Sequence, residues 1–481
     1  MAQVQSVRRR SVLVCSSPLL LAACFAWGGE APEVEWRVVL PSHFADKNQD
    51  LEKTSDGGLI LSAGVLLKTD ARGDPLWETS FDGMVYSGPS IRQLKDGHYI
   101  VGGTFTTGEG MALIKVDPQG RILWQKAFGG EGAWGYAVEA TADGGYAVTG
   151  TMQMEAASLY VVRTDGDGNL LWEATYVGAD PSDSGLGYSL QETPDGGFIV
   201  AGVRSREGAI LLKVDWQGNL LWEKRLSDGG VSPTGAWVVR VTEDGGYLLA
   251  GAESRDGKET GFLWKTDEEG NTLWMNRFPG PAGFCWLRTL DLTSDGGAVA
   301  VGTVQVLPPA GESGVGDVDV YLVRVNRAGE FLWEKRLLTA DPDVGLGVVQ
   351  MPDGGYAVST KTTAEGEGPR YATLIKLGPD PSSPGPFLRR GDVGGEGTID
   401  LSDAILILNY LFLAGPAPPC LDASDADDDG EVALTDGIVV LQFLFLGGEP
   451  PKTPGPNTCG PDPTPDGLSC RSAGSCAGGR G

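Results

Sequence analysis

A tripeptide that recurs at regular intervals is the feature that most constrains the fold of this chain. Asp-Gly-Gly has its aspartate at Asp56, Asp143, Asp195, Asp244, Asp295 and Asp353, and Asp96 begins the variant Asp-Gly-His. A tryptophan preceded by an apolar residue follows all but the last of these turns, at Trp77, Trp124, Trp172, Trp222, Trp274 and Trp333. Self-similarity at a period of this length is typical of repeat architectures.

One repeat unit, residues 135–177, shows what each repeat forms. It contains four short runs of alternating residues, at 135–141, 146–152, 159–164 and 170–177. Ala-Asp-Gly-Gly separates the first two runs and Asp-Gly-Asp-Gly-Asn the last two, and both are hairpin-turn sequences. Four antiparallel strands in about 50 residues describe one blade of a β-propeller.

The count of turns and tryptophan strands predicts how the ring closes. There are seven Asp-Gly-Gly or Asp-Gly-His turns, but only six tryptophan strands follow them. The missing strand stands at the other end of the chain, where VEWRVVL (34–40) matches LLWEKRL (220–226). The sequence therefore predicts an all-β propeller over 34–377, with the N-terminal strand completing the last blade. We expect seven blades, with eight as the alternative.

The recurring residues are accounted for by the fold. Glycine after each aspartate supplies the positive φ that a tight turn needs, and the aspartate side chain accepts hydrogen bonds from the turn backbone. Large flat rings that recur once per blade are expected to pack between neighbouring blades. The D-x-x-G-x-x-L-W unit resembles the docking repeat of quinoprotein-like propellers, and 34–377 resembles the DGGY/GNxLW-repeat propellers of exported bacterial proteins. The resemblance implies the fold but no activity, and we predict neither catalytic residues nor a bound quinone.

The N-terminus is typical of an export signal. Three arginines, at positions 8–10, precede an apolar stretch of about 13 residues at 11–23, which is too short to span a bilayer. The stretch ends in Leu-Ala-Ala-Cys, which resembles a bacterial lipobox, so we expect a signal peptide over 1–23 and lipidation of Cys24. A plain signal peptide cut near Ala26 is the alternative. Both place the protein outside the cytoplasm, in the cell envelope or beyond it.

The net charge excludes two classes of partner. Lys and Arg number 37 against 64 Asp and Glu, and the formal net charge is -27. Such a surface repels nucleic acid and anionic membranes, so neither is an expected partner, and the membrane is reached only through the lipid.

The chain changes character after a linker at 378–386. Residues 392–415 align without gaps on 425–448, at an offset of 33, and each copy has a polar loop of 12 residues followed by an apolar run. Calcium-binding loops of the EF-hand type supply oxygen ligands from positions 1, 3, 5, 7, 9 and 12, with glycine at position 6. The predicted ligands are Asp392, Glu396, Thr398 (carbonyl), Asp400 and Asp403 in the first copy, and Asp425, Asp427, Asp429, Glu431 (carbonyl) and Asp436 in the second.

The two loops are not expected to bind Ca²⁺ equally. Gly394 leaves position 3 of the first loop without a side-chain oxygen, and Ala433 does the same at position 9 of the second. The second site should therefore be the stronger. Apolar residues at position 8, Ile399 and Val432, predict a short strand contact between the loops. The tripeptide Arg390-Gly391-Asp392 matches a cell-adhesion motif by coincidence, because Asp392 is needed as position 1.

These residues carry a second resemblance. Residues 387–450 resemble dockerin domains, the paired calcium loop-helix modules that bind cohesins. Within the Cys/Pro/Gly-rich tail at 451–481, the cysteine-bearing stretch 459–470 looks like the tails on such domains in planctomycete-like bacteria. The resemblance implies a cohesin-like partner. An acidic glycine-rich linker is the alternative for the whole segment. The four cysteines of the region, Cys420, Cys459, Cys470 and Cys476, allow three pairings.

Two functions follow from this organisation. The first is an exported, non-enzymatic binding or scaffolding protein that docks through its calcium module, in an assembly that degrades polysaccharides, with a glycan or protein ligand on the propeller. The second is a polysaccharide-active hydrolase or lyase with an appended dockerin. An enzyme needs a carboxylate pair outside the repeat pattern. A carboxylate in one blade, facing the centre where other blades lack one, would favour the enzyme.

Overall fold

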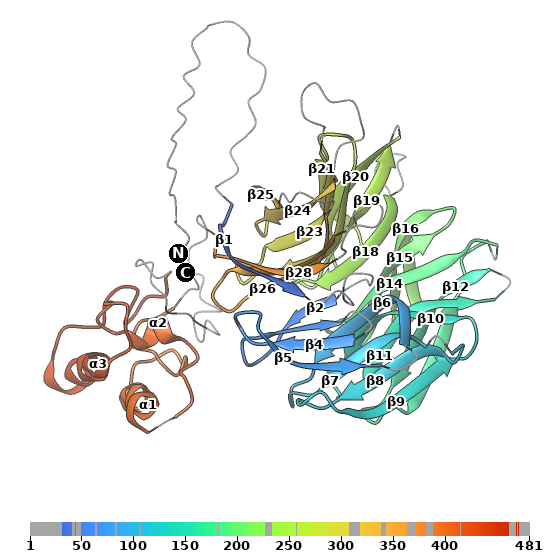
Figure 1. The fold of residues 1–481 in the computed structure, drawn as a ribbon. Coiled ribbons are helices and arrows are strands. Elements are labelled where there is room, and N and C mark those ends of the chain that lie inside the picture. Colours follow the sequence, from blue (N-terminus) through green and yellow to red (C-terminus); the bar gives the residue numbers. More distant parts are fainter. Residues whose placement is uncertain are drawn as a thin grey trace, which may run out of the picture.

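The computed structural model describes a seven-bladed propeller followed by a small helical region (Figure 1). It describes residues 31–40, 44, 50–62, 65–81, 84–105, 107–154, 156–180, 182–226, 233–255, 257–306, 318–337, 343–362, 371–380, 388–413, 415–460, 468 and 470. The predicted signal peptide and Cys24 lie outside these residues. No helix that the structure describes is long and apolar enough to cross a membrane.

Seven four-stranded antiparallel sheets form the propeller, as the repeats predict. Blade 1 consists of β2 (Asp50–Lys53), β3 (Leu59–Ser62), β4 (Val65–Thr69) and β5 (Pro75–Ser80). Blade 2 consists of β6 (Met84–Gln93), β7 (Tyr99–Phe105), β8 (Gly110–Val116) and β9 (Ile122–Gly129). Blade 3 consists of β10 (Ala133–Ala140), β11 (Tyr146–Gln153), β12 (Ala157–Thr164) and β13 (Leu170–Tyr176), close to the four predicted runs.

The next three blades repeat this order of strands. Blade 4 consists of β14 (Gly185–Glu192), β15 (Phe198–Arg204), β16 (Gly208–Val214) and β17 (Leu220–Arg225). Blade 5 consists of β18 (Pro233–Val241), β19 (Tyr247–Arg255), β20 (Lys258–Thr266) and β21 (Thr272–Pro279). Blade 6 consists of β22 (Cys285–Leu292), β23 (Ala298–Gln305), β24 (Val318–Val325) and β25 (Phe331–Leu337).

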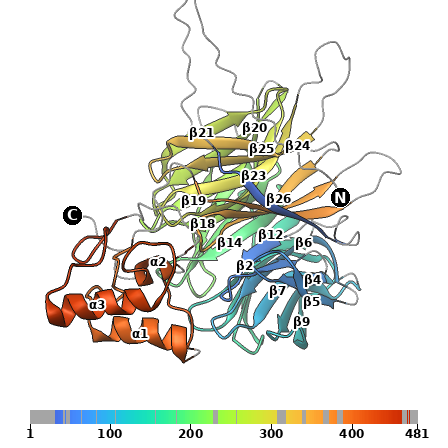
Figure 2. The same cartoon turned by 60° about the vertical axis from the view of Figure 1, so that its left-hand side comes forward.

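Blade 7 is made from both ends of the propeller segment. Its sheet has the order β1 (Val34–Leu40), β28 (Ala372–Leu377), β27 (Tyr356–Thr362), β26 (Asp343–Gln350). β1 lies antiparallel to β28, with Arg37 opposite Ile375 and Leu40 opposite Ala372. The inner strand of each blade is the one at the end of its sheet that faces the centre of the ring: β2, β6, β10, β14, β18, β22 and β26. Consecutive inner strands contact one another, and β26 contacts β2, so the ring is complete. The seven sheets are arranged around a common centre (Figure 2).

A tryptophan on the outer strand of each of six blades packs over a turn of the next blade. Trp172 in β13 lies against Gly218 of blade 4, where an added Cβ would come within 2.8 Å of the ring. Gly218 has φ +84°, which a side chain also disfavours. The Trp172 indole donates to the Trp216 carbonyl at 3.0 Å. The same arrangement recurs for Trp77 over Gly120, Trp124 over Gly168, Trp222 over Gly270, Trp274 over Gly329 and Trp36 over Gly73.

A buried cation inside most blades holds the Asp-Gly-Gly turn. The third strand contributes a Lys or Arg whose charged group pairs with the turn aspartate, as Lys213 does with Asp195 at 2.8 Å. Although burial opposes the charge, this hydrogen bond lowers the pKa of Asp195 to about 2. Equivalent pairs join Lys68 to Asp56, Arg163 to Asp143, Lys265 to Asp244, Arg324 to Asp295 and Lys376 to Asp353. In the Asp-Gly-His variant, His98 lies 3.1 Å from Asp96 instead.

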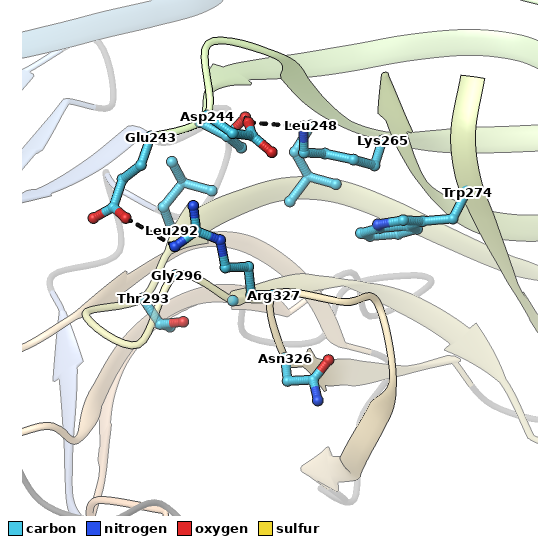
Figure 3. A pocket seen from close by; sticks show the side chains of 12 residues that line it. Glu243, Asp244, Leu248, Lys265, Trp274, Leu292, Thr293, Gly296, Asn326 and Arg327 are labelled. Carbon is cyan, nitrogen blue, oxygen red and sulfur yellow. Dashed lines mark hydrogen bonds and ion pairs between the residues drawn. The ribbon is translucent and has the colours of Figure 1, made fainter. Parts of the chain in front are cut away.

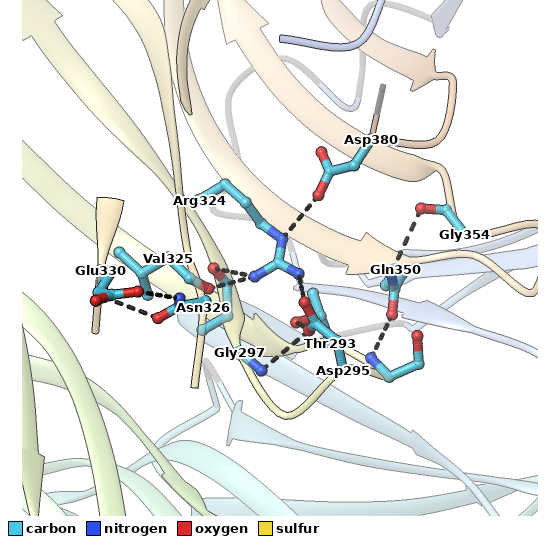
Figure 4. A network of polar contacts seen from close by, with 12 residues as sticks. Thr293, Asp295, Gly297, Arg324, Val325, Asn326, Glu330, Gln350, Gly354 and Asp380 are labelled. Atoms are coloured by element: carbon cyan, nitrogen blue, oxygen red, sulfur yellow. Dashed lines mark hydrogen bonds and ion pairs between the residues drawn. The ribbon is translucent and has the colours of Figure 1, made fainter. Parts of the chain in front are cut away.

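A network around Asp380 joins blade 6 to blade 7, where β1 pairs with β28 as the fourth strand of the sheet (Figure 4). Arg324 of β24 donates to Asp380 at 3.1 Å and to Asp295 at 2.6 Å. Tyr356 of β27 donates to Asp380 at 2.9 Å, and the indole of Trp333 also donates to this carboxylate. The Trp333 indole thus donates to Asp380, whereas the equivalent tryptophan of each other blade packs over a turn glycine.

Three helices follow the propeller: α1 (Leu401–Phe412), α2 (Leu421–Ser424) and α3 (Leu434–Leu446). The core between α1 and α3 consists of Val393, Ala404, Ile407, Ala426 and Val440, all buried. Residues 451–460 lie back on the start of the region, where Leu388 and Gly460 exchange two backbone hydrogen bonds at 2.8 and 3.0 Å. A disulfide joins Cys420 to Cys470, which selects among the pairings that the sequence leaves open. Cys459 is also disulfide-bonded.

We predict that Gly73→Ala destabilises the protein more than Gly57→Ala. Both glycines lie in blade 1 with nearly equal φ, +81° and +82°, but only Gly73 faces the Trp36 ring of β1, 2.7 Å from an added Cβ, while nothing lies within 4 Å at Gly57. The backbone strain of about 1–2 kcal/mol is common to both. Overpacking adds about 1–3 kcal/mol for Gly73→Ala alone. Thermal midpoints of the two variants measure the difference, and equal midpoints would contradict the position of β1.

Candidate metal centres

The structure brings together three carboxylates in each of the two acidic loops. Ligand atoms of Asp392, Glu396 and Asp403 lie within 4.8 Å of one another ahead of α1. Those of Asp425, Asp427 and Asp436 do the same ahead of α3. These six residues are among the predicted ligands. Clusters of acidic groups are common without a metal, so the details of the loops have to be considered.

The backbone of both loops wraps the carboxylates in the same way. In the first loop Asp403 accepts from Val393 N at 2.7 Å, Gly394 N at 3.0 Å and Asp400 N at 2.8 Å. In the second, Asp436 accepts from Ala426 N at 2.7 Å, Asp427 N at 3.3 Å and Ala433 N at 2.7 Å. All these partners are related by the offset of 33 residues. The two copies therefore share the hydrogen bonds to the carboxylate at position 12 as well as their sequence pattern.

The predicted bend also falls at position 6 of each loop. Gly397 has φ +99° and its N–H donates to Asp392 at 2.9 Å. Gly430 has φ +88° and donates to Asp425 at 2.9 Å. Because a left-handed backbone strains other residues, glycine lets each loop turn sharply around the carboxylate at position 1.

Crowding raises the pKa of several of these carboxyls. Burial raises the pKa of Asp436 to about 6, and the charges of Asp427 and Asp425 add to the effect. Burial raises the pKa of Asp427, with Asp429 and Asp425 contributing, and burial likewise raises that of Asp403 beside Glu396. Like charges held this close favour either a proton or a cation between them.

One carboxylate oxygen in the second loop is suited to binding a cation. Asp427 Oδ1 is buried and has no hydrogen-bond donor among the described residues. A buried carboxylate oxygen without a donor is costly unless a charge or water lies against it. Carboxylate and carbonyl oxygens are the ligands that Ca²⁺ prefers, so the residues of this loop fit that ion.

The remaining predicted ligands lie outside the two carboxylate clusters. Asp400 is the N-cap of α1 and accepts from Ser402 N at 2.7 Å, and Asp429 accepts from Glu431 N at 3.0 Å. Thr398 and Glu431 stand at position 7, where only the carbonyl would bind, and both side chains are exposed. The clusters therefore contain positions 1, 5 and 12 in the first loop and 1, 3 and 12 in the second.

The predicted strand contact between the loops is wrong for the part of the chain that the structure describes. No strand or bridge joins Ile399 to Val432 there. Both side chains instead pack against the core between α1 and α3. Packing of the helices already buries these residues, so no backbone pairing is required.

Arg390 links the two copies. Its side chain is fully buried and donates to the Asp422 and Asp425 carbonyls at 2.9 and 2.6 Å, and to the Asp428 carboxylate at 2.7 Å. The arginine of the Arg-Gly-Asp tripeptide therefore lies inside the protein and is not available to an adhesion receptor. Nothing in the neighbouring sequence indicates this role for the arginine.

We predict two calcium-binding events in the full-length chain. Asp425→Ala should weaken the tighter event and Asp392→Ala the weaker one, each by at least about tenfold in affinity, since loss of even an outer-shell partner costs that much. Isothermal titration with Ca²⁺ measures both. Asp167→Ala, at an exposed propeller turn, is the control and should change neither event. Loss of the weaker event in Asp425→Ala, or of the tighter event in Asp392→Ala, would contradict the predicted order of affinity.

Charged residues that break the repeat lie on the inner strands of the propeller. The residue four positions before each turn aspartate differs from blade to blade: Glu52, Arg92, Glu139, Gln191, Arg240, Asp291 and Val349. Arg92 lies 3.1 Å from Glu139 of blade 3 and 3.5 Å from Asp50 of blade 1. Asp291 accepts from Gln350 N of blade 7 at 2.9 Å. These carboxylates stand outside the repeat pattern, and each of them joins neighbouring blades.

Glu52 is the member of this group with the most altered acidity. Burial raises its pKa to about 7, although Arg92 and the hydrogen bond from Gln93 N, 2.8 Å long, favour the charged form. A carboxyl whose pKa is higher in the folded protein stabilises the fold most at low pH, where it is protonated. That contribution is lost as the pH rises through about 7.

We predict that Glu52→Gln flattens the pH dependence of stability. Relative to the wild type, the variant should gain thermal stability between about pH 4.5 and 7, because glutamine carries no charge to bury. Thermal midpoints across this range measure the gain. Glu131→Gln, at an exposed loop position, is the control. A constant difference between Glu52→Gln and wild type at all pH values would contradict the raised pKa.

A small pocket lies between blades 5 and 6 (Figure 3). Its volume is about 110 Å³, and Trp274, Leu248, Leu292 and the ion pair of Lys265 with Asp244 line it. A second ion pair, Arg327 with Glu243 at 3.3 Å, lies at its edge. This volume is well below the roughly 300–1,000 Å³ that is typical of small-molecule sites.

Comparisons with known proteins assign neither a family nor an activity to this chain. No protein-family profile matches the chain, and no curated protein matches it. A Bacteroides caccae protein of unknown function is 13% identical, with a TM-score of 0.38 over 61% of this chain and 94% of that one. A Dyadobacter fermentans protein of unknown function is 13% identical, with a TM-score of 0.42 over 72% and 99%. A gluconolactonase-like protein is 12% identical, with a TM-score of 0.34 over 71% and 91%.

Proposed function

We propose that this chain is an exported binding or scaffolding protein that docks through its C-terminal region when that region binds calcium. The observation that carries the proposal is the duplicated loop, in which three carboxylates cluster in each copy, those at positions 1 and 12 recur, and the carboxylate at position 12 accepts from equivalent backbone donors. Lipidation of Cys24 would hold the protein at the cell envelope. The propeller would remain free to bind a second ligand.

Exposed apolar side chains on the helices support docking. Four positions in α1 and its C-cap are exposed, and the residues 33 positions later are exposed in α3. The pairs are Leu401 with Leu434, Ile405 with Ile438, Phe412 with Phe445, and Leu413 with Leu446. Leu401, Ile405 and Phe412 are spaced by 4 and 7 residues, so they share one face of α1.

The size of these side chains argues for a protein partner. Phe412, Leu413, Phe445 and Leu446 are between 62 and 79% exposed. Burying one such side chain contributes about 1.5–3 kcal/mol, so a partner that covers two or three of them gains substantial affinity. We infer a cohesin-like module as the partner, in keeping with the resemblance of 387–450 to dockerins. Calcium would order the loop that precedes each helix and so fix the apolar face.

We predict that the full-length protein binds a cohesin module in Ca²⁺ and releases it in EDTA. The double variant Phe412→Ser/Phe445→Ser should lose binding by at least about tenfold, which corresponds to about 1.4 kcal/mol, and should keep its calcium affinity. Biolayer interferometry against a panel of purified cohesins measures the first, and calorimetry the second.

The matched control is Leu171→Ser/Leu221→Ser, which replaces two exposed apolar residues of the propeller. Its binding should equal that of the wild type. Binding that persists in EDTA, or that the helix variant leaves unchanged, would contradict calcium-dependent docking. Absence of binding to every module in the panel would contradict the choice of partner.

A further inference from the structure

A β-bulge recurs at the same place in the inner strands of consecutive blades. The pairing with the second strand of the blade shifts by one residue, and the residue left unpaired is Tyr136 in β10, Tyr188 in β14, Trp237 in β18 and Arg288 in β22. A fifth bulge, in β26, leaves Leu346 unpaired. A bulge re-aims the side chain of its extra residue. The inner strands pair on one side only, so their other edge faces the centre of the ring.

The bulge residues of blades 3 to 6 form a set that the repeat does not require. We call Tyr136, Tyr188, Trp237 and Arg288 the bulge row. All four are half-buried rather than packed into a core. The Tyr136 and Tyr188 rings of blades 3 and 4 lie 5.7 Å apart. Three aromatic rings and a guanidinium thus stand at equivalent positions of consecutive blades, close to the centre of the propeller.

The polar ends of the bulge row have no protein partner among the residues that the structure describes. Neither tyrosine hydroxyl, nor the Trp237 indole N–H, nor the Arg288 guanidinium makes a hydrogen bond or ion pair there. By contrast, the hydroxyls of Tyr146 and Tyr176 donate to carbonyls at 3.2 and 2.8 Å. Aromatic polar groups in sheltered positions normally find a partner. The four polar groups of the bulge row have no such partner among the described residues, so their O–H and N–H groups remain available to donate hydrogen bonds to a ligand.

Of the two arginines of this region, Arg288 points to a negative charge on that ligand. Burial lowers the pKa of Arg288, and burial together with the nearby charge of Arg92 lowers that of Arg240. Arg240 donates only to the Val239 carbonyl, at 3.0 Å, and forms no ion pair within the described residues. Three carboxylates act on Arg240 electrostatically, those of Asp291, Asp50 and Glu139. No carboxylate among the described residues shifts the pKa of Arg288, which stands out in a chain of net charge -27. A guanidinium pairs best with a planar carboxylate, which takes two of its N–H groups.

We propose that the bulge row is a binding site for an acidic oligosaccharide whose sugar residues carry carboxylates. The C–H groups of a pyranose face carry a partial positive charge, which complements the negative faces of Tyr136, Tyr188 and Trp237. The tyrosine hydroxyls and the indole N–H bind sugar hydroxyls, and Arg288 binds the carboxylate. The acidic surface elsewhere disfavours long polyanions such as nucleic acid.

The test titrates the full-length protein with short oligomers of galacturonic acid, and with galactose oligomers of the same length. Tryptophan fluorescence and calorimetry should show binding of the acidic oligomer and binding at least tenfold weaker for the neutral one. Arg288→Gln and Trp237→Ala should each weaken binding of the acidic oligomer at least tenfold. Because Arg288 contacts no described polar partner, a thermal midpoint close to that of the wild type is expected for Arg288→Gln. Trp237→Ala also removes the contact with the Trp286 ring, whose centroid lies 5.5 Å away, so its midpoint should be lower.

Two control variants test whether binding is specific to the bulge row. Trp216→Ala removes a tryptophan that is 64% exposed on an outer turn of blade 4, and Arg72→Gln removes an exposed arginine of blade 1; both should bind as the wild type does. Equal binding of neutral and acidic oligomers, no binding of either, or binding unchanged in Arg288→Gln and Trp237→Ala would overturn the proposal. The titration is repeated in EDTA and should give the same affinity, so its failure is distinguishable from failure of calcium-dependent docking.

Discussion

The packing of an outer-strand tryptophan over a glycine turn of the next blade is the contact on which the propeller depends. It requires two things at once: a large flat ring on one blade, and on the next a turn without a side chain in a left-handed backbone. Each blade supplies only one of these two parts, and the neighbouring blade supplies the other. Stability is therefore shared between neighbours around the ring, as in other repeat proteins.

The two ends of the ring show how far this constraint reaches. Trp36 of β1 lies over Gly73 of blade 1, although β1 belongs to a blade whose other three strands come from the far end of the propeller segment. At the preceding junction no glycine turn exists among the described residues, and Asp380 accepts the Trp333 indole while pairing with buried Arg324. A buried carboxylate held by a guanidinium, a hydroxyl and an indole replaces the packing contact with polar ones. Such a network is stable only when every member has a partner.

The two acidic loops and the bulge row both contain sheltered polar groups without the usual partners, but the loops have an excess of acceptors and the bulge row an excess of donors. In the loops, burial and neighbouring carboxylates raise the pKa of Asp436 and Asp427, and a cation is the partner we propose for them. In the bulge row, half-buried donors lack acceptors within the described part of the chain, so a ligand rich in oxygen is the missing component. The first arrangement is local to 12 consecutive residues, whereas the second combines four blades.

That difference in range separates what the sequence determines from what the tertiary structure decides. Turn, tryptophan and loop signals are local, so the sequence alone predicts seven blades, the paired loops and the carboxylates that cluster in them, among them Asp392, Asp403, Asp425 and Asp436. The burial of Arg390, the choice of Cys470 as the partner of Cys420 and the role of Asp380 were not predictable, because each joins residues far apart in the chain. The bulge row belongs with these. Tyr136, Tyr188, Trp237 and Arg288 are about 50 residues apart in sequence, and only the packing of consecutive blades gives them equivalent positions around the centre of the ring.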